Sequence, residues 1–388
     1  MPNHIAHIGF VAGNYPSPSQ PYAATFFEQL IHKQANHGLR CSVVVPWSIQ
    51  RWVQDSIAIR RGCDFVAKQH DMVTVLRPLC LSFASPRFGL LQCPRISQAL
   101  YQMAALRAFQ RLDSMPDAFY GHFLYPAGGT AVWLGRQLRR PSFVAMGEGS
   151  FWSIKNLGPE RAKANFAQAT GMIAVSSLLK KMLISELAIS PDKIAVFPNG
   201  VDRGLFFPRP RAEMRTKWNL PQDAFLVAFV GGFDYDKGAS RVAEAIEGLD
   251  GVFGIFAGAG PLPPRGTNVA FAGRIPHDKL PEFLSTADVF ALPTTYEGSC
   301  NAIIEAMTCG LPIITSVGEF NDDLVDDTMA IRIDPLDVNA IRAAVVAVRD
   351  DSARRRRLAE AALVRSRHFD LDVRATKIED WMNQCCRK

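Results

Sequence analysis

Two glutamates eight positions apart, Glu297 and Glu305, mark the segment whose residues are best suited to chemistry. Apolar runs at 288–295 and 311–316 flank it, so the pattern predicts a strand, a loop, a helix that begins near Ser299, and a second strand. The first turn of a helix offers unpaired N–H groups and a partial positive charge, which favour a bound phosphate. At about 1.5 Å per helical residue, the two carboxylates would lie roughly 10–12 Å apart along the axis. A diphosphate between them would place a sugar at one carboxylate and a ribose diol at the other.

Taken alone, this spacing also fits two unrelated glutamates, one in a loop and one on a solvated helix face. The neighbouring residues favour the first interpretation. Together, Glu297-Gly298-Ser299, Asn301 and Glu305 resemble the signature of retaining glycosyltransferases of family 4. Further segments resemble that family in the same order: 196–202 (VFPNGVD), 229–231 (FVG), 236–238 (DKG), 257–261 (AGAGP) and 269–274 (VAFAGR).

Strands and helices alternate along the chain, which predicts an α/β protein with parallel sheets and helices on both faces. In the first half, a strand at 5–12, a helix at 25–37 and a strand at 41–46 form one such unit. In the second half, a strand at 225–232 and a strand at 252–258 flank a helix that ends at Glu247. Ligands of such sheets bind at the carboxyl ends of the strands.

The resemblance covers nearly the whole chain, and it implies the GT-B fold, in which two Rossmann-like domains face each other across a cleft. Residues 1–200 would form the N-terminal, acceptor-binding domain, and residues 201–370 the C-terminal domain that binds a nucleotide sugar. A terminal helix over 371–388 would cross back to the first domain. Before it, 352–370 is expected to be a helix whose arginines are simply solvated.

The resemblance also assigns roles in the second domain. Lys237 would pair with the donor diphosphate as a point charge in a glycine-bordered loop. Glu305 would accept hydrogen bonds from the ribose hydroxyls. Glu297 would hold hydroxyls of the transferred sugar and balance positive charge at its anomeric carbon. The remaining donor-binding positions are the backbone of the phosphate loop, the start of the helix and the nucleobase loop: Gly231, Gly232, Gly298, Ser299, Cys300, Asn301, Arg274 and Ile275.

In the first domain, His122 and the turn at Ala23 and Ala24 are expected to close over the sugar and phosphate, with His122 counted among the catalytic residues. An ordinary core histidine is an equally good interpretation of His122. Glu148 and Asn199 are candidates for contacts with the sugar or the acceptor.

Three positions depart from the family pattern. Gly232 stands where the family usually has an arginine, which removes one of two cationic contacts to phosphate. Ala23 and Ala24 replace a glycine loop, although alanine adopts positive φ less readily than glycine. Glu148 lies where the family often has a histidine.

For the reaction, the resemblance implies a same-face displacement in which the leaving phosphate accepts the proton of the acceptor. No side chain then acts as a nucleophile, and no cofactor beyond the nucleotide-sugar substrate is expected. The pair Asp234 and Asp236 imitates a metal-binding Asp-x-Asp motif. Acids at this spacing are common in loops, so we expect no required metal.

Composition agrees with a soluble enzyme. A chain of 388 residues with 48% hydrophobic residues is long enough for two domains with separate cores. No run of 18 apolar residues occurs, and the N-terminus lacks a charged leader, so neither a membrane span nor a signal peptide is expected. Eight scattered cysteines without a Cys-x-x-Cys pair indicate reduced thiols and a cytoplasmic location.

The charge is unevenly divided along the chain. Residues 1–200 carry a balance of +10, and residues 201–388 carry −4. Long-range electrostatics would draw the basic half to an anionic membrane surface, although ordinary solvated helix faces explain the same charges. No aromatic-and-basic motif or zinc-finger spacing favours nucleic acid as a partner.

The sequence therefore predicts a retaining glycosyltransferase that uses a lipid-linked or polysaccharide acceptor in cell-surface glycan synthesis, on the cytoplasmic membrane face. A nucleotide-sugar epimerase of the same architecture is one alternative, and a catalytically silent nucleotide-sugar-binding protein is another. A nicotinamide dehydrogenase is disfavoured, because Gly258 and Gly260 are followed by Pro261 rather than by the Gly-x-Gly-x-x-Gly pattern.

Overall fold

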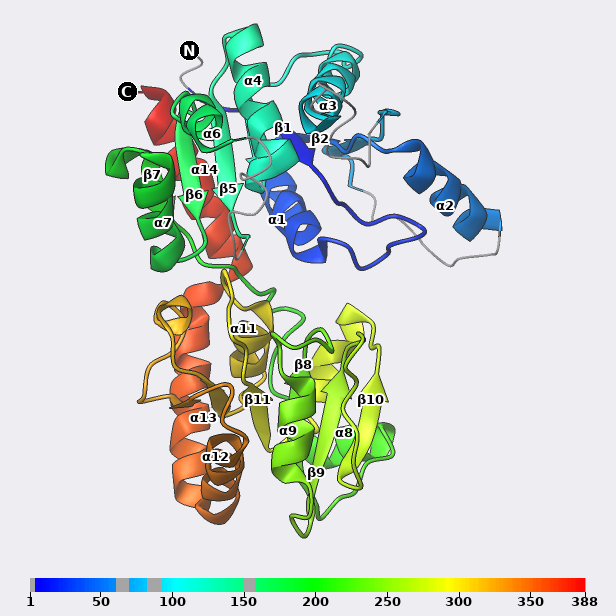
Figure 1. The fold of residues 1–388 in the computed structure, drawn as a ribbon, viewed down its shortest axis with the longest axis vertical. Coiled ribbons are helices and arrows are strands. Elements are labelled where there is room, and N and C mark those ends of the chain that lie inside the picture. The colour runs from blue at the N-terminus through cyan, green and yellow to red at the C-terminus, as the bar shows by residue number, and fades with distance from the viewer. Residues whose placement is uncertain (1–3, 61–69, 82–92, 149–157, 388) are drawn as a thin grey trace. The chain divides into compact units, whose positions relative to one another are not determined.

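The computed structural model describes residues 4–60, 70–81, 93–148 and 158–387. The chain divides into two compact α/β units, coloured along the chain in Figure 1. Unit 1 comprises Met1–Phe197 and Asp372–Lys388, and unit 2 comprises Pro198–Leu371. The domain boundary expected near Gly200 lies close to this division.

Unit 1 is built on a sheet of seven parallel strands in the order β3-β2-β1-β4-β5-β6-β7. The strands are β1 (His7–Ala12), β2 (Arg40–Val44), β3 (Val73–Leu76), β4 (Ala118–His122), β5 (Ser142–Met146), β6 (Gly171–Ala174) and β7 (Ile194–Val196). Its helices are α1 (Thr25–Asn36), α2 (Ile49–Arg60), α3 (Cys93–Phe109), α4 (Gly129–Leu138), α6 (Pro159–Phe166), α7 (Ser177–Leu187) and α14 (Leu371–Arg387).

The central strands of this sheet are buried along their whole length, β1, β4, β5 and β6 included. Both faces of the sheet must therefore be covered, which explains the near-continuous apolar runs of the sequence. The aromatic ring of Phe10 on β1 packs against Phe27 of α1 and Tyr120 of β4. The parallel α/β architecture predicted from the alternation is thus confirmed.

The terminal helix α14 packs on unit 1, as predicted. A Cβ atom added at Gly171 of β6 would lie 2.4 Å from the Trp381 ring, so this strand needs glycine to accept the helix. At the other end of the contact, the His37 imidazole at the end of α1 lies 3.0 Å from a Glu379 carboxylate oxygen. The helix before it, α13 (Ser352–Ser366), stops earlier than expected, because a short turn at Arg367–Phe369 ends it.

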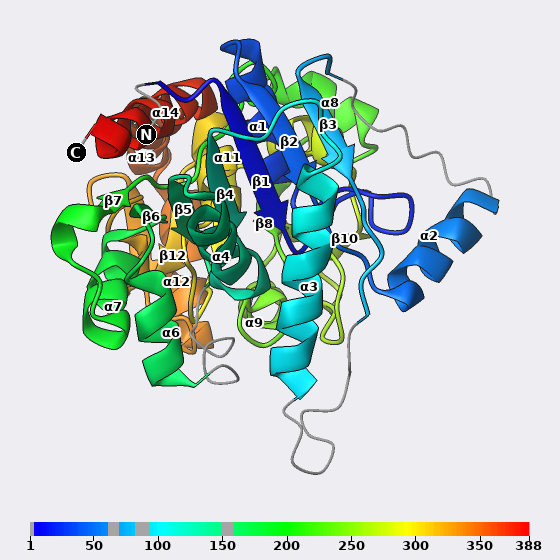
Figure 2. The ribbon, with the colours of Figure 1, turned by 90° about the horizontal axis from the view of Figure 1, so that it is seen from above.

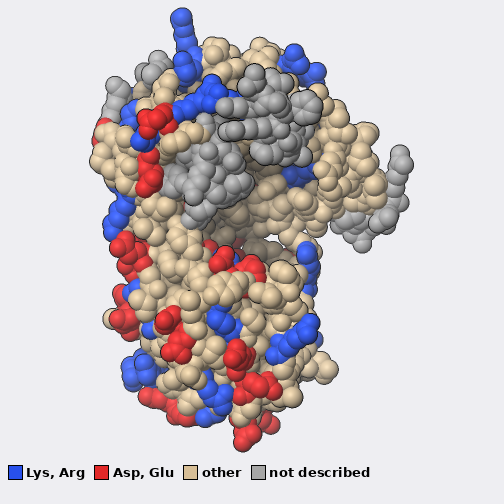
Figure 3. Space-filling model, in the orientation of Figure 1, with Lys and Arg blue, Asp and Glu red and all other residues tan. Residues whose placement is uncertain are grey.

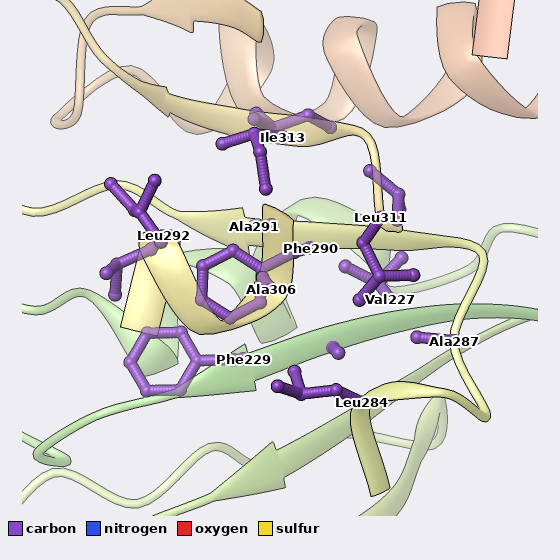
Figure 4. Close-up of a cluster of buried hydrophobic side chains, with 14 of the residues drawn as sticks. Val227, Phe229, Leu284, Ala287, Phe290, Ala291, Leu292, Ala306, Leu311 and Ile313 are labelled. Carbon is purple, nitrogen blue, oxygen red and sulfur yellow. The ribbon is translucent and has the colours of Figure 1, made fainter. Parts of the chain in front are cut away.

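Unit 2 contains six parallel strands in the order β10-β9-β8-β11-β12-β13. They are β8 (Phe225–Val230), β9 (Val252–Ala257), β10 (Val269–Gly273), β11 (Val289–Leu292), β12 (Ile313–Ser316) and β13 (Ala330–Ile333). Its other helices are α8 (Arg211–Lys217), α9 (Ala239–Ile246), α10 (Leu280–Leu284), α11 (Asn301–Thr308) and α12 (Val338–Asp350). Figure 4 shows the buried core between them, where Phe229, Phe290 and Leu292 lie near Ala306 of α11.

Two glycines in unit 2 allow a close approach of backbone to the loop after β8. A Cβ atom at Gly258 would lie 1.9 Å from the Gly231 carbonyl oxygen, and one at Gly260 would lie 2.3 Å from the Phe233 carbonyl oxygen. Any side chain at these positions would push the loop away. The two chain segments at the ends of unit 2 are joined, since the Val201 N–H donates to the Phe369 carbonyl at 2.8 Å and the Leu371 N–H donates to the Val201 carbonyl at 3.0 Å.

The described part of the chain contains free cysteines and no helix suited to span a membrane. Free thiols are present at Cys41, Cys80, Cys300, Cys309, Cys385 and Cys386, whereas the side chains of Cys63 and Cys93 lie outside the described residues. Among the helices described, none has the length and apolar character that crossing a membrane requires.

Candidate functional site

In both sheets the strand order reverses next to the first strand, between β1 and β4 in unit 1 and between β8 and β11 in unit 2. Loops on either side of such a switch point leave a crevice at the carboxyl ends of the strands. In unit 2, the loop after β8 carries Gly231, Gly232 and Lys237, and the loop after β11 carries Glu297. The sequence-predicted donor residues therefore belong to the two loops at the switch point.

Lys237 and Glu297 form an ion pair across these two loops, with the Lys237 ammonium donating to a Glu297 carboxylate oxygen. Burial alone would lower the pKa of Lys237, but the facing Glu297 carboxylate outweighs it and the net shift is upward. The lysine is thus a fixed positive charge at neutral pH, as a phosphate ligand requires.

The Asp-x-Asp pair holds the same two loops together. The Lys237 N–H donates to Oδ1 of Asp234 at 2.9 Å. From the other loop, Thr295 donates its N–H to the Asp236 carbonyl at 2.9 Å and its hydroxyl to Asp236 Oδ1 at 3.0 Å. Both acids therefore have hydrogen-bonding tasks within the loops. Within the described residues, no group of three or more His, Cys, Asp or Glu side chains is arranged to hold a metal ion.

The start of α11 is the third part of the candidate donor site. Ser299 is buried and accepts two hydrogen bonds from Asn199. The backbone N–H of Asn199 donates to Ser299 Oγ at 3.1 Å, and the side-chain Nδ2 of Asn199 donates to the Ser299 carbonyl at 3.0 Å. Asn199, predicted as a sugar or acceptor contact, is placed here as a positioning residue for the helix start. No hydrogen bond within the described residues uses the N–H groups of Ser299, Cys300 or Asn301. They remain available to an anion.

Cys300 precedes the first residue of α11 in an extended conformation. Burial, followed by the nearby Glu297 carboxylate, raises the pKa of its thiol well above the usual range. The thiol is therefore protonated and unreactive, and only the backbone of Cys300 is suited to a ligand.

Glu305 lies on α11, is 8% exposed and accepts a hydrogen bond from His277 at 2.9 Å between Oε1 and Nε2. His277 belongs to the short turn after β10, the same loop that carries Arg274 and Ile275. Arg274 is exposed, whereas Ile275 packs against the core. His277 was not identified from the sequence, and its position soon after Arg274 in the expected nucleobase loop was the signal available.

The missing arginine of the phosphate loop is not replaced by a neighbouring one. A Cβ atom at Gly232 would lie 2.5 Å from Asp234 Oδ2, so a carboxylate covers the position where the family usually has a cation. The nearby guanidinium of Arg241 donates to the carbonyls of Tyr235 at 2.7 Å and Pro293 at 2.8 Å. These bonds commit Arg241 to the backbone, and Lys237 is the phosphate-loop cation that remains.

In unit 1, His122 ends β4 and is 7% exposed. Its ring stacks on Phe27 with centroids 4.0 Å apart, and neither ring nitrogen has a hydrogen-bond partner among the described residues. Burial, with a smaller effect of the Arg374 charge, lowers its pKa to about 3. His122 is therefore a neutral imidazole that is able to donate or accept a hydrogen bond but not to supply a proton as an imidazolium.

Glu148 follows β5 and contacts the turn that follows His122. Its Oε1 accepts the Leu124 N–H at 2.5 Å, whereas Oε2 has no partner within the described part of the chain. Burial raises the pKa of this carboxyl to about 7. The intervening residue, Phe123, has φ of 72° and packs its ring on His122 with centroids 4.4 Å apart. The 123–124 turn thus contacts both sequence-predicted residues, His122 through the Phe123 ring and Glu148 through the Leu124 N–H.

The turn at Ala23 and Ala24 leads into α1. Ala24 directly precedes the helix with φ of 54° and ψ of 35°, the left-handed conformation that favours glycine. Its carbonyl accepts the N–H groups of Phe27 and Glu28 at 3.0 and 3.1 Å. The glycine-like backbone of this turn is therefore kept although both glycines are replaced by alanine.

Comparison with known families divides the chain in a similar way. The family described as Glycosyltransferase Family 4 matches residues 23–205, and the one described as Glycosyl transferases group 1 matches residues 224–351. TuaC of Bacillus subtilis, a protein assigned to teichuronic acid biosynthesis as a glycosyltransferase, is 27% identical over 80% of this chain and 81% of its own. An Escherichia coli UDP-Gal:alpha-D-GlcNAc-diphosphoundecaprenol alpha-1,3-galactosyltransferase is 31% identical, over 47% of this chain and 52% of its own length.

Solved structures give the same architecture. Sucrose-phosphate synthase from Thermosynechococcus elongatus superposes with a TM-score of 0.75 at 20% identity, over 97% of this chain and 98% of its own. Anabaena HepE in complex with UDP-glucose superposes with a TM-score of 0.70 at 17% identity, over 98% of this chain and all of its own. The two family matches, the relatives and the fold agree, and the chain belongs to the family 4, group 1 glycosyltransferases with the GT-B fold.

Proposed function

We propose that this glycosyltransferase moves one sugar, with retention of configuration, from a nucleotide-sugar donor to a lipid-linked or polysaccharide acceptor in cell-surface glycan synthesis. The observation that carries the proposal is the Lys237–Glu297 ion pair beside the open start of α11. This arrangement offers a cation and free N–H groups to a diphosphate and a carboxylate to the attached sugar.

In the proposed reaction, the donor diphosphate binds between Lys237 and the N–H groups of Ser299, Cys300 and Asn301. Lys237 then exchanges its carboxylate partner for phosphate, which leaves Glu297 to accept hydrogen bonds from the sugar. The bond between the anomeric carbon and the phosphate oxygen breaks, and the bond to the acceptor oxygen forms on the same face. The acceptor's proton passes to the leaving phosphate, whose charge Lys237 and the helix start stabilise. No metal ion takes part in this scheme.

The nucleoside part of the donor is assigned to the loop after β10 and to α11. Glu305, oriented by His277, would accept the ribose hydroxyls, and the backbone around Arg274 and Ile275 would hold the base. Glu148 and the neutral His122 are assigned to the hydroxyls of the transferred sugar. Neither is proposed as a nucleophile.

The acceptor class is supported by two relatives. The name of the Escherichia coli enzyme describes transfer to a sugar linked to diphosphoundecaprenol, and that of TuaC refers to teichuronic acid. Both names concern bacterial glycans, and this chain resembles TuaC over most of its length. A lipid-linked glycan intermediate is therefore the preferred acceptor, and a polysaccharide end is the second choice.

An exposed apolar face on α2 supports a peripheral position on the cytoplasmic membrane surface. Ile49, Trp52, Val53 and Ile57 are all between 42% and 56% exposed, and their spacing places them along one side of the helix. Tryptophan is enriched at membrane interfaces. The +10 balance of residues 1–200 adds attraction to anionic lipids, whereas Figure 3 shows acidic and basic side chains interspersed on the visible face of unit 2.

The function is tested by screening UDP-, GDP- and ADP-sugars for thermal stabilisation of the full chain, followed by turnover with a diphosphoundecaprenol-linked sugar. We expect one donor class to raise the melting temperature and to be consumed, with an α-configured donor giving an α-linked product by NMR. Lys237→Gln is the matched control and should lose both responses. Stabilisation without transfer to any acceptor and without slow donor hydrolysis would favour the silent binding protein, and epimerised donor would favour the epimerase.

A further inference from the structure

Helix α4 of unit 1 lies between α3 and α6, as the two views in Figures 1 and 2 show. The three helices line a surface cavity of about 390 Å³. None of the residues assigned to the donor site lines it. Six of its lining residues matter for ligand chemistry: Arg95, Gln98, Trp133, Arg136, Arg161 and Asn165.

The charge of this cavity is one-sided. Arg95 comes from α3, Arg136 from α4, and Arg161 from α6, so three helices converge with a cation each. No aspartate or glutamate is among the described residues that line the cavity, and none of the described acids forms an ion pair with these arginines. Three arginines that line one cavity, with no carboxylate among its described lining residues, favour an anionic ligand, because arginine pairs with phosphate or carboxylate through two parallel hydrogen bonds.

A buried amide indicates what accompanies the anionic group. Gln98 is 8% exposed, and its Nε2 donates to the Pro126 carbonyl at 3.2 Å and to Thr130 Oγ1 at 3.1 Å. The Thr130 hydroxyl also donates to that carbonyl, at 2.8 Å. A carbonyl only accepts, so these bonds fix the orientation of the amide and leave Oε1 on the other side. Oε1 is shielded from solvent and has no donor within the described residues, so a ligand hydroxyl would reach it through a small shift of the cavity wall and supply the missing donor.

The floor of the cavity is open because α4 begins with a glycine. A Cβ atom at Gly129 would lie 3.4 Å from Asn165 Nδ2 and 3.5 Å from Gln98 Nε2, in contact with both amides. One turn further along α4, the half-buried Trp133 also lines the cavity. An indole beside amides and arginines matches a sugar, which has an apolar ring face and a rim of hydroxyls.

We propose that this cavity binds a saccharide unit that carries an anionic group, either a phosphate or a carboxylate. The three arginines hold the anionic group, Gln98 Oε1 accepts a sugar hydroxyl, and Trp133 covers the ring. The site is separate from the donor site, and its assignment to a remote unit of the glycan acceptor rests on the proposed function. Binding in this cavity would hold the acceptor through a charged sugar unit that lies at a distance from the hydroxyl that reacts.

The test is calorimetric titration of the full chain with glucose 1-phosphate, glucuronic acid, glucose and inorganic phosphate. We expect saturable binding of at least one anionic sugar, with at least tenfold higher affinity than for glucose or phosphate alone. The two anionic sugars distinguish phosphate from carboxylate as the preferred group. Equal binding of glucose and both anionic sugars, or no binding of any, would overturn the proposal.

Variants locate the binding. Arg136→Gln combined with Arg161→Gln should weaken it about tenfold or more, since each removes a charge-assisted hydrogen bond. Gly129→Ala, which is compatible with the helix, should weaken it by filling the floor. Arg107→Gln on α3, outside the cavity, is the matched control and should bind as the parent does. Lys237→Gln in unit 2 reports separately on any ligand that occupies the donor site. Loss in Lys237→Gln but not in the arginine variant would assign the ligand to the donor site and overturn the proposal.

The two hypotheses fail separately. Sugar transfer without binding in this cavity would refute the cavity alone, whereas binding in the cavity without any transfer would refute the proposed function alone. Because Arg136 and Arg161 are exposed, their substitution is not expected to unfold unit 1, and circular dichroism checks this. If Gly129→Ala does not fold, the arginine variant decides the matter by itself.

Discussion

His277 Nε2 lies 2.9 Å from Glu305 Oε1, which joins the turn after β10 to the middle of α11. The two residues are far apart in sequence, and the Phe206 ring lies beside the imidazole with centroids 5.3 Å apart. The hydrogen bond fixes the orientation of a carboxylate that is almost completely buried. A fixed acceptor loses little freedom on binding, which suits the ribose contact that we propose for Glu305.

Glu305→Ala is expected to weaken donor binding, because a ribose diol would lose its charged acceptor. Hydrogen bonds to charged groups contribute roughly 1.5–3 kcal/mol, so the dissociation constant should rise about 10- to 150-fold. His277→Ala should weaken binding less, since it removes the positioning contact and keeps the acceptor. Titration with the matching nucleotide measures both, and an unchanged constant in Glu305→Ala would refute the ribose contact.

Glu297→Gln is expected to lower turnover more than it lowers donor affinity. Glutamine keeps the shape and most hydrogen bonding. It removes the charge that pairs with Lys237 in the free enzyme and that, in the proposed reaction, faces the developing cation. Steady-state kinetics and nucleotide-sugar titration separate the two effects. Turnover within about threefold of the parent would show that Glu297 only positions the sugar.

Glu148 should make unit 1 less stable as the pH rises. Burial raises its pKa from 4.5 to about 7, so the folded state holds a proton that the unfolded state has released between these values. The contribution of Glu148 to the free energy of unfolding is fully present below the unfolded pKa. It is lost as the pH rises through about 7, which lowers the free energy of unfolding by up to roughly 3 kcal/mol. Glu148→Gln should remove this part of the pH dependence. Urea unfolding at pH 5 and pH 8 measures the free energy of unfolding of the parent and of Glu148→Gln. The same change between the two pH values in both proteins would contradict the prediction.

Ala24→Gly is expected to raise the free energy of unfolding by up to about 1 kcal/mol, because glycine adopts φ of 54° without the strain that alanine has. Ala23→Gly is the matched control, since Ala23 has no positive φ and glycine there should be destabilising by about 0.5–1 kcal/mol. Thermal unfolding of the two variants should shift in opposite directions. Equal destabilisation would show that the turn relaxes around alanine.

Membrane association should depend on the apolar face of α2 and on charge. Trp52→Ser combined with Ile57→Ser should reduce binding to vesicles that contain anionic lipid. Arg139→Glu combined with Arg140→Glu should also reduce this binding, and the reduction should depend on salt, because charges are screened within about 10 Å at 0.1 M salt. Val364→Ser, an equally exposed position on α13, is the control. Sedimentation with vesicles measures all three, and no binding by the parent would remove the lipid surface from the proposal.

The alternation of apolar runs was sufficient to predict both sheets, because buried parallel strands have continuous apolar sequences and the intervening helices have their own period. The Glu297–Glu305 spacing and the family resemblance selected Lys237, Glu297 and Glu305 as candidates, and the structure brings Lys237 and Glu297 into contact. What the spacing could not give are contacts set by packing: the clamp of Asn199 on Ser299 and the bond between His277 and Glu305 join segments that only the fold brings together. The aromatic stack around His122 is another such contact, and the burial of this histidine, with a smaller effect of Arg374, lowers the pKa of the imidazole.

The pairing of Val201 with the segment that ends at Leu371 means that unit 2 begins and ends at the same place. In the linear chain, unit 2 is an insertion between the two parts of unit 1. An insertion whose ends adjoin can be exchanged between related proteins without stretching either attachment. If unit 2 binds the donor and unit 1 the acceptor, as we propose, the two preferences are free to recombine as separate inherited modules.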